Sequence, residues 1–537
     1  MTRRHLLQGA AAGAGSLSLL GLLSACGGAA GGVGGDRSAV TWGLSGEISS
    51  LDTLTLSGGE ALTLISLVLE GLTALSVDDG RMVVQLAERW EQPDELTNVY
   101  TLREGVRFSD GTPLTVEDVV YSFERQLDPE NASANAYTLG STKSVEATGE
   151  REVTIKLASP SVQAQYGPAV LGGYVVSRKA AEAAGSAFGS PQALPVGTGP
   201  YVFEEWVPGE RVVLRRNPHY WGDAPPVERI TARLFKDEQT RLVAMRTKSL
   251  DAALQFPLAQ ARQWEAVSQP QYVQFHRINY LSFDLTRKPW DDLAIRRAFA
   301  YAIDREGILQ AAVQGHGQIA SSIVPELNFL GVISQQQTDE IVSTLPSYEY
   351  DPERARAELA KSSQPRGFEA TMTVDEAASI AGQAVAENLA AIGVRLKIRQ
   401  LTTPDFFAKV LSHEDMGLML IRFYTDYPDP DMMPWILLKS EFAKPNQFNS
   451  ASYSNPEVDA LLERQARLAG TIQRNPERVN LERARIIGQV ARRQQLDLPY
   501  LPLIVEEASV ATRSGVRVED FNGWYINQPA LGRVTKG

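Results

Sequence analysis

Cysteine is nearly absent from this sequence, since Cys26 is the only one among 537 residues. A disulfide needs a second cysteine and a thiolate metal cluster needs several, so neither can form within one chain. Cys26 also precedes all the segments that we expect to fold, which leaves the folded part without a thiol nucleophile. The fold must therefore be stabilised by core packing and by polar contacts.

Histidine is scarce as well, and no two histidines have the helical spacing of a metalloprotease or the spacing of a zinc finger. The sequence also lacks a G-x-S-x-G elbow, a Walker A loop and an S-x-x-K motif with its partners. We therefore expect no metal site, no cofactor and no catalytic residue. The histidines are His5, His219, His276, His316 and His413.

An excess of positive charge is missing too. The chain has 52 Lys and Arg against 64 Asp and Glu, a formal net charge of -12. Binding to nucleic acid requires a broad basic surface, so this class of function is excluded. The negative charge favours solubility and weakly attracts cationic solutes.

Long apolar runs are absent, because no segment approaches the roughly 18 uninterrupted apolar residues of a membrane-spanning helix. The N-terminus instead has "MTRRHLLQ" with Arg3 and Arg4, then the short apolar "GAAAGAGSLSLLGLLSA", then "LSACGG". This order resembles a bacterial lipoprotein signal, and the arginine pair resembles a twin-arginine export signal. We expect a signal peptide at 1–25, lipidation of Cys26, a flexible tether at 26–37, and an extracytoplasmic protein anchored to the cell membrane. The alternative is a chance cysteine in an apolar leader.

Strand-like and helix-like segments alternate along the rest of the chain, which predicts mixed α/β domains. Thr115 and Asp118 form a short capping box ahead of the helix "VEDVVYSFERQL". The other expected helices are 60–75, 237–254, 289–313, 351–361, 381–392, 456–468 and 477–495. The expected strands include 38–44, 151–159, 211–216, 279–285, 395–401, 417–423 and 501–511.

The stretch "RFYTDYPDPDMMPW" (422–435) places Asp426, Asp429 and Asp431 close together. Three such carboxylates are compatible with a metal site, an acid–base pair, a site for a cationic ligand, or only a polar loop. The spacing does not fit an EF-hand, which needs acids at alternate positions and a central glycine. Its three prolines are incompatible with a helix through the segment.

Several blocks of the sequence resemble the extracellular solute-binding proteins of ABC importers, in the oligopeptide/dipeptide/nickel family (family 5). They include "LAERWEQPDELTNVYTLREGVRFSDGTPLTVEDVVYSFER", "VGTGPYVFEEWVPGERVVLRRNPHYWG" and "INYLSFDLTRKPWDDLAIRRAFAYAIDREGI". Two further blocks are "DPERARAELA" and "YSNPEVDALLERQ". The resemblance extends from about residue 38 to the end.

The resemblance implies an α/β fold of two lobes, the periplasmic-binding-protein type II-like fold with an extra inserted domain, three domains in all. Closure of the lobes around a ligand is the expected motion. The implied boundaries are 36–66, 197–286 and 505–537 for lobe 1, 67–196 for its inserted domain, and 287–504 for lobe 2.

The resemblance also implies site residues. In peptide-binding members an aspartate after a strand, followed by an acid–proline pair, binds the α-ammonium of the peptide, and "TDYPDP" matches with Asp426. Phe423, Tyr424 and Thr425 would follow the peptide backbone, with Asp429 and Asp431 as loop and cap residues. Weaker candidates are Glu47 and Tyr280 for the pocket and Arg422 for a peptide carboxylate. Phe423 replaces a frequent tryptophan, Arg422 a small residue, and Asp284 a frequent asparagine.

The resemblance implies a substrate-binding lipoprotein that is a monomer, does no chemistry, and captures oligopeptides or dipeptides for a membrane-embedded ABC permease. One alternative keeps the fold and changes the ligand to a nickel chelate or an oligosaccharide. Another is a secreted hydrolase that uses paired carboxylates, which no motif supports.

Overall fold

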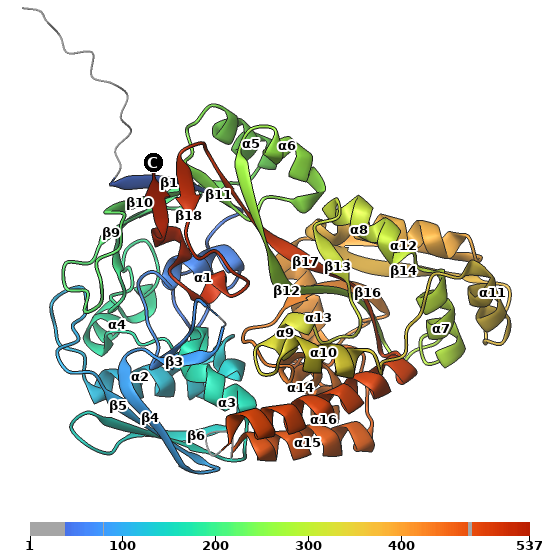
Figure 1. Ribbon diagram of the computed structural model, residues 1–537, viewed down its shortest axis with the longest axis horizontal. Coiled ribbons are helices and arrows are strands. Elements are labelled where there is room, and N and C mark those ends of the chain that lie inside the picture. Colours follow the sequence, from blue (N-terminus) through green and yellow to red (C-terminus); the bar gives the residue numbers. More distant parts are fainter. Residues whose placement is uncertain (1–37, 79, 471–474) are drawn as a thin grey trace, which may run out of the picture. The chain divides into compact units, whose positions relative to one another are not determined.

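The largest element of the fold is an 11-stranded mixed sheet, seen in a computed structural model that describes residues 38–78, 80–470 and 475–537 (Figure 1). Cys26, Arg3 and Arg4 lie outside the described residues. The sheet order is β15 (Val394–Leu401), β14 (Phe368–Asp375), β16 (Leu418–Tyr424), β12 (Gln269–Phe283), β17 (Tyr500–Thr512), β11 (Ala252–Leu254), β1 (Ala39–Ser45), β10 (Arg229–Phe235), β9 (Arg211–Arg216) and β8 (Tyr201–Val207), with β13 (Gly317–Ile319) on β17.

Strands β12 and β17 are the longest strands of this sheet and pair antiparallel with each other, from Gln269 opposite Thr512 to Ser282 opposite Tyr500. On its other edge β12 pairs antiparallel with β16, whose seven residues Leu418–Tyr424 all have partners. Strand β16 pairs with β14 only through Leu418–Leu420. The C-terminal half of β16 therefore has a strand on one edge only in the described part of the chain.

A second sheet has its own core. It has four strands, in the order β4 (Ala87–Asp94), β5 (Thr97–Leu102), β7 (Glu152–Leu157) and β6 (Thr142–Ala147). Helix α2 (Val116–Leu127) packs on it through Val119 and Phe123, which are buried with Tyr100 and Val153. This sheet falls within the predicted inserted domain, 67–196, whose boundaries stay a prediction. Two smaller sheets pair β2 (Thr73–Leu75) with β3 (Met82–Val84), and β18 (Val516–Val518) with β19 (Val534–Lys536).

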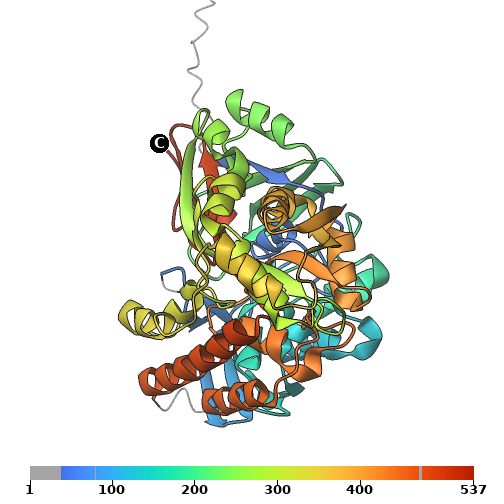
Figure 2. The same cartoon turned by 90° about the vertical axis from the view of Figure 1, so that its right-hand side faces the viewer.

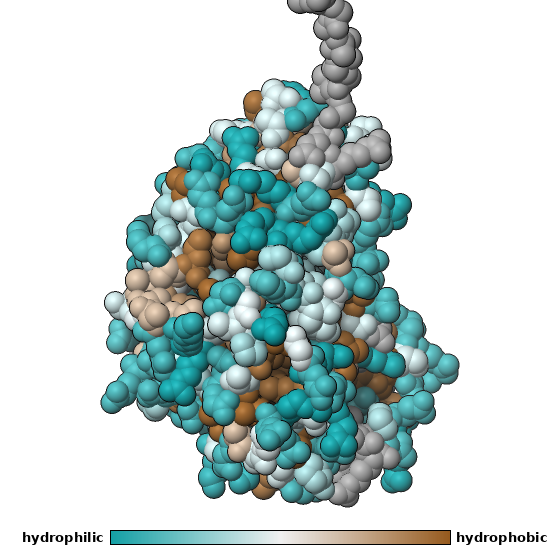
Figure 3. Space-filling model, turned by 90° about the vertical axis from the view of Figure 1, so that its left-hand side faces the viewer, coloured by the Kyte–Doolittle hydropathy of each residue, from teal (hydrophilic) through white to brown (hydrophobic). Residues whose placement is uncertain are grey.

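Helices surround these sheets, and α15 and α16 lie side by side in both ribbon views (Figures 1 and 2). The face of the molecule drawn in Figure 3, the left-hand side of Figure 1, is mainly hydrophilic, and its apolar residues are gathered in patches between polar ones. The other helices are α1 (Gly59–Ile65), α3 (Val162–Tyr166), α4 (Arg178–Ala184), α5 (Glu238–Arg246), α6 (Ala261–Glu265), α7 (Leu293–Ala302), α8 (Arg305–Val313), α9 (Glu326–Leu330), α10 (Gln335–Val342), α11 (Pro352–Ala360), α12 (Ser379–Ala390), α13 (Thr403–Ser412), α14 (Met432–Leu438), α15 (Pro456–Ala469) and α16 (Pro476–Asp497).

The interleaved α/β character and the capping box of α2 are confirmed. The helix predicted at 60–75 is wrong beyond Ile65. The backbone there bonds to distant segments, because Leu67 and Glu70 carbonyls accept hydrogen bonds from the N–H groups of Tyr201 and Val175. An apolar run buried on every side carries no helical periodicity, and these tertiary bonds determine its conformation.

Two more helix predictions are partly wrong. The segment 237–254 forms α5 and then strand β11, which pairs with β1 and β17. The segment 289–313 is two helices, since the Asp304 side chain accepts a hydrogen bond from the Gly307 N–H and starts α8. The prolines were expected to exclude a helix through 422–435, which holds as far as Asp431, whereas α14 begins at Met432 with Pro434 in its first turn. A proline in the first helical turn is tolerated, because the N–H groups of that turn have no partner within the helix and the missing one is not needed.

Asp429 lies in the loop between β16 and α14, as expected, but its side chain is buried in an ion pair that the sequence did not predict. Arg483 of α16 donates to both of its carboxylate oxygens, Nη1 to Oδ2 at 3.0 Å and Nη2 to Oδ1 at 2.8 Å. Both side chains are 1% exposed. Asp431 is the N-cap residue of α14, as expected of a cap, although its side chain bonds to Gln465 instead of a helix N–H. The buried ion pair therefore ties the segment after β16 to α16.

We predict that Asp429→Asn lowers the free energy of unfolding by about 3–5 kcal/mol, because it removes the carboxylate that receives both hydrogen bonds of the buried Arg483 guanidinium. The measurement is urea denaturation of the full chain, followed by tryptophan fluorescence. Asp415→Asn is the matched control, since its ion pair with Arg287 is exposed (53% and 74% for the two side chains) and should contribute less than about 1 kcal/mol. Equal losses in both variants would contradict a structural role for the buried pair.

Candidate ligand-binding site

The candidate site begins where strand β16 ends at Tyr424. Pro428 and Pro430 follow within six residues and cannot donate to a sheet, so the chain leaves the strand here. Asn328 of α9 holds the segment in place. Its Nδ2 lies 3.1 Å from Thr425 Oγ1 and 3.0 Å from the carbonyl oxygen of Asp429. The loop is therefore anchored on both sides of Asp426.

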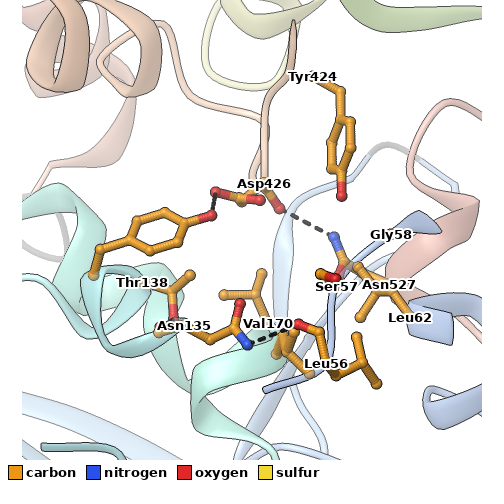
Figure 4. A pocket seen from close by; sticks show the side chains of 12 residues that line it. Leu56, Ser57, Gly58, Leu62, Asn135, Thr138, Val170, Tyr424, Asp426 and Asn527 are labelled. Atoms are coloured by element: carbon orange, nitrogen blue, oxygen red, sulfur yellow. Dashed lines mark hydrogen bonds between the residues drawn. The ribbon is translucent and has the colours of Figure 1, made fainter. Parts of the chain in front are cut away.

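Asp426 is bound by residues from two distant segments (Figure 4). The hydroxyl of Tyr137, in the short 3-10 helix Ala136–Leu139, donates to Asp426 Oδ2 at 2.9 Å. Asn527 Nδ2, near the C-terminus, donates to the Asp426 carbonyl oxygen at 3.1 Å. The chain thus brings Tyr137 to the carboxylate of Asp426 and Asn527 to its backbone carbonyl.

These residues line a small cavity of about 50 Å³. Ser57 and Gly58, which precede helix α1, and Leu62 of α1 line one side of it (Figure 4). A cavity of this size has room for only a few water molecules. The full lining is Leu56, Ser57, Gly58, Leu62, Asn135, Tyr137, Thr138, Val170, Leu171, Tyr424, Asp426 and Asn527.

Burial raises the pKa of Asp426 to about 6, although the hydrogen bond from Tyr137 acts in the opposite direction. The side chain forms no ion pair with Lys, Arg or His in the described part of the chain. Its neighbour Tyr137 also has a raised pKa, through burial and then through the charge of Asp426. Asp426 is therefore a carboxylate that is removed from much of the solvent and lacks a cation.

The other predicted site residues are not all near this cavity. Tyr424 lines it, while the Phe423 ring packs edge-on against Phe448 with centroids 5.4 Å apart. Glu47 is exposed and pairs with Lys236. Tyr280 is 1% exposed and is part of the core.

The side chain of Tyr280 meets the ring of Tyr500 edge-on, with the centroids 5.5 Å apart. Arg422 donates to both carboxylate oxygens of Glu506, at 2.8 Å each. Its guanidinium is therefore already occupied by a protein carboxylate. Glu47, Tyr280 and Arg422 are not among the residues that line the cavity, and their roles toward a ligand stay predictions.

Sequence reasoning missed Tyr137 and Asn527. Nothing in "NAYTLG" or "WYINQP" marks them, because their role depends on a contact with Asp426 across 289 and 101 positions of the sequence. Residues 38–78, 80–470 and 475–537 contain no cluster of three His, Cys, Asp or Glu side chains suited to a metal ion. Within these same ranges no helix combines the length and apolar character that crossing a membrane requires.

Known proteins are similar to this chain both in sequence and in fold. The chain is 28% identical over 456 residues to the glutathione-binding protein GsiB of Salmonella typhimurium, covering 82% of this chain and 83% of that one. It is 29% identical over 409 residues to heme-binding protein A of Haemophilus influenzae, covering 70% and 72%. These relatives are named as binding proteins, not as enzymes.

The structure resembles the ABC transporter-associated periplasmic binding protein DppA of Helicobacter pylori in complex with the peptide STSA, with a TM-score of 0.79. The two chains are 21% identical, and the match covers 93% of this chain and 98% of that one. This likeness confirms the predicted periplasmic-binding-protein type II-like fold. Residues 81–444 match the family of bacterial extracellular solute-binding proteins, family 5 (middle region). The match covers more than half of the sequence, and the chain therefore belongs to the bacterial extracellular solute-binding proteins of family 5.

Proposed function

We propose that this protein captures an oligopeptide or dipeptide and delivers it to a membrane-embedded ABC permease, without chemical change. The observation that carries the proposal is Asp426, a carboxylate that lines a small cavity and has no cationic partner among the described residues. The α-ammonium of a peptide supplies the missing charge. Removal of water strengthens such a charge-assisted hydrogen bond.

The edge of β16 supports an extended peptide as the ligand. Strand β14 covers β16 only as far as Leu420, which leaves Ile421–Tyr424 without a second strand in the described chain. A peptide beside this edge would gain backbone hydrogen bonds that do not depend on its sequence, as in strand addition. Phe423, Tyr424 and Thr425 would then follow the ligand backbone and end at Asp426.

Ligand entry requires the cavity to open, because about 50 Å³ is too small for a dipeptide. Its lining comes from the segments near 56–62, 135–171, 424–426 and 527, which belong to different predicted domains. We infer that the lobes separate by bending at β17, which crosses the predicted boundary between 504 and 505, and at the end of β12, which leads to the boundary between 286 and 287. Closure around the ligand then restores the contacts of Asp426.

The leader supports a location at the outer face of the cell membrane. We propose export directed by Arg3 and Arg4, cleavage before Cys26, and lipidation of that cysteine. The tether 26–37 would leave the folded part free to meet the permease as a monomer. The sequence motif supports this part of the proposal, since these residues lie outside the described structure.

Asp426→Asn should weaken binding of free peptides by about 2–5 kcal/mol, since it removes the charge that meets the ammonium. The measurement is isothermal titration calorimetry with unblocked and N-acetylated members of a peptide library, preceded by a thermal-shift screen. Stability at pH 8 should not fall, because the raised pKa of Asp426 shows that the ionised form is disfavoured in the empty site. The exposed control Asp415→Asn should bind as wild type does.

The proposal fails if Asp426→Asn binds free peptides as tightly as wild type does. It also fails if no peptide raises the melting temperature while a sugar or a nickel chelate does.

Affinity for a peptide ammonium should be constant above about pH 7 and should fall as the pH drops through about 6, where Asp426 becomes protonated in the free protein. Below that pH, binding must release the proton, so affinity decreases by up to about tenfold per pH unit. Tyr137→Phe removes a hydrogen bond that lowers this pKa and should move the midpoint to higher pH. Titrations at several pH values test this, and a pH profile in Asp426→Asn as steep as in wild type would assign the dependence to another group.

Cys26→Ser should move the full chain, expressed in a bacterial host, from the membrane fraction to the soluble fraction, since a serine cannot receive the lipid. Ser24→Ala, which keeps the cysteine, is the control. Fractionation and mass spectrometry of the mature N-terminus measure the outcome. A Cys26→Ser protein that remains in the membrane fraction would contradict anchoring at this position.

A further inference from the structure

Two carboxylates face the two ring nitrogens of His316, which lies on the loop between α8 and β13. The imidazole Nδ1 lies 3.1 Å from Oε2 of Glu507 in β17, and Nε2 lies 3.6 Å from Oε1 of Glu265 in α6. The side chains of His316, Glu507 and Glu265 are partly exposed, at 23%, 30% and 41%. None of the three lines the cavity beside Asp426. The cluster is therefore a charged site separate from the candidate ligand site.

A neutral imidazole can satisfy only one of these two carboxylates. It has a single N–H, whereas the imidazolium has one on each ring nitrogen and a positive charge. The hydroxyl of Tyr272 in β12 donates to Glu265 Oε1 at 2.9 Å and holds that carboxylate in place. The Tyr272 ring also stacks on the imidazole, with the centroids 3.8 Å apart and the planes at 16°, and an aromatic face attracts a cation. Glu265, Glu507 and Tyr272 are the ionisable side chains that contact the ring among the described residues, and each interacts more strongly with the imidazolium.

The backbone of this loop is bonded to the same part of the chain by contacts that do not titrate. The His316 carbonyl accepts a hydrogen bond from the N–H of Glu507. Gln314 Nε2 donates to the carbonyl of Ala259, and Gln314 Oε1 accepts from the N–H of Arg262. The ring is thus held between its two carboxylates whether or not it is charged. Protonation changes the strength of this contact more than its geometry.

The predicted lobes meet at this loop. His316 belongs to predicted lobe 2, whereas its three ionisable neighbours belong to predicted lobe 1. Next to His316, strand β13 pairs with Ile504–Glu506 of β17, which spans the predicted boundary between the lobes (Figure 1). Bending at β17 would therefore change the distances from the imidazole to Glu265 and Tyr272.

We propose that His316 is a pH-sensitive link between the lobes, which favours the lobe arrangement of this structure when the imidazole is protonated. This inference rests on the proposed function in one respect, since it takes separation of the lobes as the route of ligand entry. Histidine is the side chain whose charge changes between about pH 5 and 8. Protonation strengthens contacts that separation of the lobes would lengthen, so a fall in pH through this range shifts the empty protein toward the closed arrangement. Partly exposed ion pairs are weak, and the equilibrium between open and closed forms should change by roughly two- to tenfold.

The test measures the radius of gyration of the empty full chain by small-angle X-ray scattering at pH 8 and pH 6. Every sample carries Cys26→Ser, which removes the proposed lipid, and Asp426→Asn, because the pKa of Asp426 is also about 6. This background chain should become more compact at the lower pH. His316→Gln, which can donate a hydrogen bond but cannot be protonated, should remove that response, and Glu265→Gln should reduce it. His219→Gln, at an exposed histidine outside the cluster, should respond as the background chain does.

Two results would overturn the link: dimensions of the background chain that do not change between pH 8 and pH 6, or an equal response with and without His316→Gln. Equal melting temperatures at pH 8, where a histidine is neutral, establish that the variant is folded. If His316→Gln does not fold, Glu507→Gln is measured in its place and should reduce the response.

Calorimetry at pH 8 on the chain with Asp426 intact tests the proposed function separately. Failure of every unblocked peptide to bind would overturn that function. The scattering result would still decide whether His316 links the lobes.

Discussion

The antiparallel pairing of β12 with β17 on one edge and β16 on the other is the constraint on which the candidate site depends. Its register places Arg422 beside Asn279 and both within reach of Glu506. A slip of one residue would turn Arg422 and Glu506 to opposite faces and leave two charges without partners. The energetic penalty of unpaired charges thus makes one register strongly favoured, and that register also directs the end of β16 toward the cavity.

The acidic residues Asp426, Asp429 and Glu506 have very different electrostatic surroundings. Asp429 and Glu506 each receive two hydrogen bonds from an arginine, so their charges are neutralised within the protein. Asp426 lies only three residues from Asp429 but receives a tyrosine hydroxyl in place of a cation. A protein that binds and releases a ligand benefits from this difference, because the paired acids hold the loop while the unpaired one retains its attraction for an external charge.

Local rules predicted the parts of the fold that depend on local contacts. Helix α2 begins after Thr115 with the expected capping box, since both partners are within three residues of each other. Predictions failed where distant segments determined the backbone, as at Leu67 and Glu70, or where one apolar pattern covered two elements, as at the boundary between α7 and α8. Apolar periodicity reports burial and does not report which segment supplies the partner.

By itself the sequence determined the family resemblance, the α/β class and the position of Asp426 after a strand, because each is written in contiguous residues. Only the tertiary structure decided that Tyr137 and Asn527 meet Asp426, that Arg483 neutralises Asp429, and that Arg422 is paired with Glu506. With 52 basic and 64 acidic residues, composition permits very many pairings. Strand register and burial select among them, since a charge removed from water is tolerated only where a partner reaches it.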